Sequence, residues 1–152
     1  MKKEIADIWV DALRSGKYSQ TVGSLCFYDD FPSSVDSPSS PTFCCLGVLC
    51  DLYIEATRDA CWTLGRTPSF SSIADHVQSF EADVLPPSVI GWSGVSNPHA
   101  VVSFDPDVEG DVVCDLVDHE TGAAYHSLVT MNDAGSSFAA IASAIEANWE
   151  TL

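Results

Sequence analysis

Three of the six cysteines fall in one apolar stretch, which runs from Pro41 to Tyr53 with the sequence PTFCCLGVLCDLY. A thiol becomes a nucleophile when it ionises, and the N-terminal end of a helix favours that ionisation. Cys44 and Cys45 would occupy such a position. Cysteine is also among the most buried residue types. We therefore expect these cysteines to pack in the core. In the alternative, in which the protein is a small hydrolase or transferase, Cys45 is the candidate nucleophile.

The histidines offer a second kind of chemistry. His99, His119 and His126, together with Asp115 or Asp118, lie on or beside neighbouring predicted strands, so they could converge on a divalent metal ion. Histidines scattered over surface turns are commoner, and the cysteines form no Cys-x-x-Cys pair of the zinc-site type. We predict no metal and no cofactor. We also favour a protein that is not an enzyme, with a Cys- or His-dependent hydrolase or transferase as the alternative.

A small anionic ligand such as a nucleotide would need cationic and aromatic side chains, together with backbone N–H groups at helix N-termini near Thr42 and Ser137. Core packing competes with this role for the aromatic residues, and turn formation competes with it for the Asn-Asp pair before Gly135. The candidate ligand-binding residues are Arg14, Lys17, Tyr18, Arg58, Arg66, Trp92, Asn132 and Asp133.

The charge of the chain is strongly asymmetric. The formal net charge is −16, and all six basic residues lie in the first 66 positions, where nine acidic residues leave −3. Residues 67–152 contain thirteen acidic residues and no Lys or Arg. This pattern argues against direct nucleic-acid binding and against an anionic membrane surface, because both need basic contacts with phosphates. It favours a basic partner protein, although solubility alone would also account for it. The candidate protein-binding residues are Asp105, Asp107, Glu109 and Asp111.

The N-terminal sequence MKKE leads directly into an amphipathic pattern that contains Asp7, which is unlike a secretory signal. No apolar run reaches the roughly 18 to 20 residues that span a bilayer. We therefore expect a cytoplasmic protein with reduced thiols. A homo-oligomer is left open.

A chain of 152 residues is long enough to fold as one globular domain over residues 1–152. Helical spacing predicts an N-terminal helix over residues 3–14, a buried Cys-rich central helix from Pro41 to about Thr57, and a C-terminal helix capped by Ser137. Gly47 disfavours the central helix by about 1 kcal/mol, so its presence indicates that another backbone passes close by. A Ser/Pro-rich loop is expected at about residues 30–41.

The remaining segments predict shorter elements. Residues 18–28 have the composition of a short strand or hairpin arm, residues 71–80 of a short helix, and residues 85–92 of one helical turn. Strands over 100–105, 111–117 and 123–129 would form an antiparallel meander, followed by a turn at 131–135. The expected fold class is α+β, with this small antiparallel meander packed against the three helices.

Four segments together resemble a family of small proteins encoded by tailed bacteriophages. They are WVDALRSGKYSQ (9–20), FCCLGVLCDLY (43–53), the LP…W segment (85–92) and the C-terminal motif NDxGxSFxxIAxxIE (132–146). The resemblance covers both ends and the middle of the chain, and it omits the Ser/Pro loop and the acidic segment 105–120. It brings no established catalytic or binding residues.

The resemblance implies a phage accessory protein that acts in the bacterial host cytoplasm. Combined with the charge pattern, it leads us to expect a counter-defence inhibitor that works by binding. Its partner would be a host defence protein, contacted through the acidic surface, or a small nucleotide signal that the protein sequesters.

Overall fold

The chain forms an α+β fold, which confirms the predicted class. A computed structural model describes residues 1–28, 40–63, 68–75, 84–100, 116–118, 120–122 and 124–152. Within these ranges the helices are α1 (Lys3–Arg14), α2 (Cys45–Thr57), α3 (Pro87–Ser93), α4 (Leu128–Asp133) and α5 (Phe138–Asn148). The strands are β1 (Ser19–Gln20), β2 (Cys26–Phe27), β3 (Thr42–Phe43), β4 (Ala60–Trp62), β5 (Phe70–Ser72), β6 (Leu116–Val117) and β7 (Ala124–Tyr125).

The strands form small sheets. β3 lies between β1, to which it is parallel, and β2, to which it is antiparallel. β4 and β5 form an antiparallel hairpin, and β6 pairs antiparallel with β7. The β6–β7 pair agrees with the last two strands of the predicted meander. Of its first strand only Ala100 is among the described residues, and it is not part of a strand.

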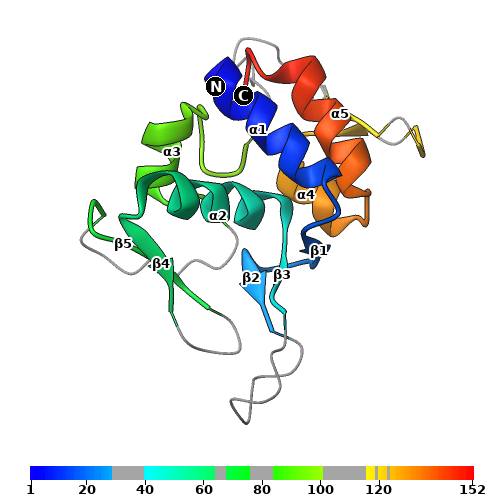
Figure 1. Ribbon diagram of the computed structural model, residues 1–152. Coiled ribbons are helices and arrows are strands. Elements are labelled where there is room, and N and C mark those ends of the chain that lie inside the picture. Colours follow the sequence, from blue (N-terminus) through cyan, green and yellow to red (C-terminus); the bar gives the residue numbers. More distant parts are fainter. Residues whose placement is uncertain (29–39, 64–67, 76–83, 101–115, 119, 123) are drawn as a thin grey trace.

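Helix α2 lies at the centre of the core, as predicted. It packs against α1, α3, α4 and β4, and Figure 1 shows it between the α1–α5 pair and the β4–β5 hairpin. The indole Nε1 of Trp9 on α1 donates a hydrogen bond to the Cys45 carbonyl over 3.0 Å. The buried residues of α2 are Cys45, Leu46, Gly47, Val48, Leu49, Cys50 and Tyr53.

The predicted start of α2, at Pro41, was wrong by four residues. Thr42 and Phe43 are extended because they pair with β1 on one side and β2 on the other. The helix begins at Cys45, and the Cys44 Sγ caps it by accepting a hydrogen bond from the Gly47 N–H. Sheet pairing therefore overrides the proline and threonine start signal.

Three other predicted elements were also wrong in part. The strand expected over 123–129 ends at Tyr125, because Ser127 caps α4 through its hydroxyl, which accepts from the Thr130 N–H. The turn expected at 131–135 is therefore partly the last turn of α4. Ser71 and Ser72, the first residues of the helix predicted over 71–80, belong to strand β5, where the Phe70 ring packs edge-on against Trp62. Residues 76–83 lie outside the described residues.

Gly47 confirms the expected close approach of another backbone. A Cβ atom at this position would lie 1.7 Å from the Leu25 carbonyl oxygen. The same carbonyl accepts a hydrogen bond from the Cys44 N–H over 3.3 Å. The chain before β2 therefore crosses directly over the first turn of α2.

We predict that Gly47→Ala lowers the free energy of unfolding by about 3 kcal/mol or more, because backbone atoms must move to admit the new methyl group. Gly91→Ala is the matched control. Gly91 lies in α3 with open space around its Cα, so there alanine should be neutral or stabilise by up to about 1 kcal/mol. Urea denaturation followed by circular dichroism measures both variants. Equal stabilities of the two would contradict the close approach.

Candidate functional site

A cavity of about 350 Å³, with a largely apolar lining that includes a few polar side chains, lies where the segment after α3 meets α4. His99 comes from that segment, and His126 and Ser127 follow β7. The structure thus brings two of the three predicted histidines to one cavity, which we call the His99–His126–Asp133 cavity. Its lining residues are His99, His126, Ser127, Val129, Thr130 and Asp133.

Hydrogen bonds hold the two sides of this cavity together. The Leu128 N–H at the start of α4 donates to the Ala100 carbonyl over 3.3 Å. Ala100 is fully buried in a left-handed conformation with φ of 49°, which is uncommon for a residue with a side chain. The Thr130 hydroxyl contacts the Ser127 hydroxyl and lies 3.4 Å from the His126 Nε2. The cavity wall is therefore built on fixed backbone.

Asp133 contributes a carboxylate at the end of α4. Its Oδ1 accepts hydrogen bonds from the Gly23 N–H over 3.1 Å and from the Asn132 side chain over 3.2 Å. Within the described chain its Oδ2 has no hydrogen-bond partner, and no Lys or Arg forms an ion pair with it. One oxygen thus fixes the carboxylate and the other is left to solvent or to a ligand.

Asn132, also a predicted ligand residue, is fully buried and ties three segments together. Its Oδ1 accepts from the Cys45 N–H over 3.2 Å and from the Gln20 Nε2 over 3.0 Å. Its Nδ2 donates to the Thr21 carbonyl over 2.9 Å and to Asp133. Protein groups therefore use the whole amide, which gives Asn132 a structural role.

Asp118 is not part of the cavity, although the sequence grouped it with the histidines. It is 1% exposed and accepts hydrogen bonds from the Ser136 hydroxyl and from the Glu120 N–H, the latter over 2.8 Å. These hydrogen bonds, that of Ser136 first, lower the pKa of the carboxyl. Asp118 therefore stabilises its own turn.

The predicted cations Arg14 and Lys17 are paired with carboxylates. Both terminal nitrogens of Arg14 donate to Glu146 over 2.7 Å, which raises the pKa of Arg14. The Lys17 Nζ lies 2.6 Å from Glu55, and this hydrogen bond raises the pKa of Lys17. These exposed pairs contribute little to stability, but they reduce the positive charge available to an anionic ligand.

Tyr18 and Trp92, the predicted aromatic ligand residues, pack in a series of six rings whose neighbouring centroids lie 5.4 to 5.9 Å apart. The Tyr18 hydroxyl donates to Asp51 over 2.9 Å, and burial is the main cause that raises its pKa to about 12. The series runs through Tyr18, Phe43, Trp62, Phe70, Tyr53 and Trp92. Packing thus accounts for both rings.

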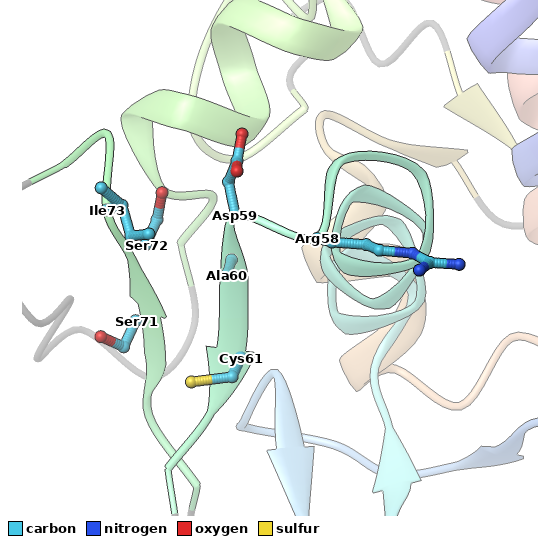
Figure 2. Close-up of a pocket in the computed structure, with 7 residues that line it drawn as sticks. All are labelled: Arg58, Asp59, Ala60, Cys61, Ser71, Ser72 and Ile73. Carbon is cyan, nitrogen blue, oxygen red and sulfur yellow. The ribbon is translucent and has the colours of Figure 1, made fainter.

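A second cavity, of about 310 Å³, lies at the β4–β5 hairpin. Arg58 borders it, but Figure 2 shows that the Arg58 side chain extends away from the strands. Cys61 and Ser71 are direct partners across the hairpin, on the face opposite the packed Trp62 and Phe70. The guanidinium of Arg58 is therefore not directed at the cysteine.

The other described cysteines are buried. Burial raises the pKa of Cys45 well above its usual range, and Cys45 donates to the Leu128 carbonyl. Backbone N–H groups at the helix start partly oppose burial at Cys44, whose pKa is still raised to about 11. Desolvation therefore outweighs the helix terminus, and Cys45 is a packing residue rather than a nucleophile.

Several predicted residues lie outside the described part of the chain. They are Arg66, the acidic residues Asp105, Asp107, Glu109 and Asp111, and His119 and Asp115. Among the residues that the structure does describe, no group of three or more His, Cys, Asp or Glu side chains is placed to hold a metal ion. No helix in that part of the chain is long and apolar enough to cross a membrane.

A family model described as a domain of unknown function, DUF8296, matches residues 1–149. The chain belongs to the DUF8296 family. A comparison with curated proteins and one with solved structures found no match.

In this DUF8296 chain, sequence reasoning missed Ser127 and Thr130 as cavity residues and Gln20 as a partner of Asn132. The Ser127-Leu-Val-Thr130 stretch did hold a signal, because serine is a preferred N-cap residue. The apolar alternation before it suggested a strand instead. Gln20 carried no signal, since its partner lies 112 residues away.

We predict that Asn132→Ala lowers the free energy of unfolding by about 2 to 4 kcal/mol, because it leaves the buried Cys45 N–H without its acceptor. Asn148→Ala is the control. Asn148 is half-buried, and its side chain donates one hydrogen bond, to the Ala144 carbonyl, so about 1 kcal/mol is expected. Urea denaturation compares the two variants. A similar small loss in both would argue against the structural role of Asn132.

The burial of the thiols predicts their reactivity. In a Cys114→Ser background at pH 8, Cys61 should react with a disulfide reagent within minutes, because it is exposed. Cys44, with its pKa raised to about 11, and Cys45 should react only after urea is added. Mass spectrometry of the peptides identifies the modified sites. Rapid labelling of Cys45 in the folded protein would contradict its assignment as a packing residue and would support a nucleophilic role.

Proposed function

We propose that this protein is a phage accessory protein that binds a basic host defence protein and inhibits it without catalysis. The observation that supports this most is the pairing of Arg14 and Lys17 with Glu146 and Glu55. Two of the candidate cations for an anionic ligand are thus neutralised internally, while the chain as a whole keeps a net charge of −16. A basic protein surface is the complementary partner. The phage context comes from the sequence resemblance.

Sequestration of a nucleotide signal is the second form of this proposal, and it is less favoured. Arg14 and Lys17 could contribute to such a site only after leaving their carboxylates. Of the predicted ligand-binding cations that the structure describes, Arg58 is the one that forms no ion pair with a described residue. Its side chain extends away from the hairpin cavity (Figure 2). The hydrolase or transferase alternative would depend on His99 and His126, since Cys45 is buried.

The proposal predicts that neutralising Asp105, Asp107, Glu109 and Asp111 together, as D105N, D107N, E109Q and D111N, abolishes inhibition. The reason is that the attraction to a basic surface is lost. The assay is the plating efficiency of a phage that needs this protein to infect a defended host. Circular dichroism verifies that the variant is folded.

The matched control makes the same change of charge elsewhere, as E4Q, D11N, D59N and E150Q. These four acids are exposed and form no ion pair with a described residue. The control should keep nearly full activity. Full activity of the first variant would contradict the acidic-surface proposal. Native mass spectrometry of the protein from infected cells gives a separate test, because a retained nucleotide would favour sequestration.

A further inference from the structure

We propose that the His99–His126–Asp133 cavity receives a guanidinium or ammonium group. In the complex proposed above, on which this part of the inference rests, that group is an arginine side chain of the basic partner.

The lining of the cavity is largely apolar, and its polar side chains include several hydrogen-bond acceptors. Asp133 lines the cavity, its Oδ2 has no hydrogen-bond partner in the described chain, and the Thr130 hydroxyl can accept. A histidine side chain in its neutral form offers one ring nitrogen as an acceptor, and His99 and His126 both line the cavity. Guanidinium and ammonium groups carry only donors, so they match this lining.

The charge at the cavity has the sign that a cation needs. No Lys or Arg of the described chain pairs with Asp133, and residues 67–152 contain neither residue type. An anionic ligand would meet the Asp133 carboxylate together with the net negative charge of the protein. A cation instead gains from both.

The size and the wall of the cavity suit a long basic side chain. Its volume of about 350 Å³ lies near the lower end of typical ligand pockets, and Val129 supplies an apolar surface for the methylene groups of an arginine stem. The carboxylate is held in place before binding by the Gly23 N–H and by the buried Asn132. Such preorganisation lowers the entropy lost when a ligand binds.

The test uses N-acetyl-arginine amide and its uncharged isostere N-acetyl-citrulline amide as probes. Both are titrated into the folded full-length protein while NMR follows the imidazole signals of His99 and His126. The arginine derivative should shift these signals saturably and bind at least about ten-fold more tightly than the citrulline derivative, because hydrogen bonds to charged groups are the stronger ones. Equal binding of the two would overturn the inference.

Asp133→Asn is the decisive variant, because its amide oxygen can still accept from the Gly23 N–H while the charge is gone. Binding of the arginine derivative should weaken by about ten-fold or more. Glu150→Gln, an equal charge change at an exposed residue outside the cavity lining, should change it by less than about two-fold. Unchanged or tighter binding by Asp133→Asn would overturn the cation site.

Two further experiments complete the test. The first distinguishes an arginine of the partner from a free polyamine, and the second distinguishes failure of this inference from failure of the proposed function. Spermidine that binds at least ten-fold more tightly than the arginine derivative would overturn the partner side chain in favour of a free polyamine. If Asp133→Asn loses the arginine derivative but supports normal plating, the cavity has no role in the complex and the acidic-surface proposal stands. If a phage that carries the variant neutralised at residues 105–111 plates normally, the acidic-surface proposal fails. The comparison of the arginine and citrulline derivatives still tests whether the cavity binds a cation.

Discussion

The architecture depends on the contact between the Leu25 carbonyl and the first turn of α2, where Gly47 has no side chain. Any Cβ atom there would collide with backbone, and backbone cannot move aside as a flexible side chain can. This contact sets how close the chain before β2 comes to α2, and therefore where β3, which pairs with β2, delivers Cys44 as the helix cap. Because α2 packs against α1, α3 and α4, the placement of these three helices depends on the close approach at Gly47.

Polar groups inside this core are matched rather than avoided. Asn132 uses its whole amide to connect β1, α2 and α4, and the Trp9 indole donates to the Cys45 carbonyl. A buried amide without hydrogen-bond partners would destabilise the folded state more than an apolar residue at the same position would. The same hydrogen bonds that fix Asn132 also orient Asp133, its neighbour in the cavity. The core and the cavity are therefore parts of one hydrogen-bonded arrangement.

The sequence predicted what depends on local periodicity. The span of α1, the start of α5 after Ser137, the burial of α2 and the close approach at Gly47 all follow from local signals. These are apolar spacing, helix capping and the cost of glycine in a helix. It failed where a distant partner decides the conformation. Thr42 and Phe43 are extended because two other strands pair with them, and Ser127 begins a helix where alternation suggested a strand. The meeting of His99, His126 and Asp133 was anticipated only for the histidines, because α4 had not been recognised.

The series of six aromatic rings has an optical consequence. Its members come from the segment before β1, from β3, α2, β4, β5 and α3, and each ring is held at a fixed angle to the next. Rings held in such an asymmetric array absorb left and right circularly polarised light to different extents. In freely rotating rings this difference in absorption averages to nearly zero. The near-ultraviolet circular dichroism of the protein therefore reports how the hairpin, the sheet and the helices pack against one another, without an attached label.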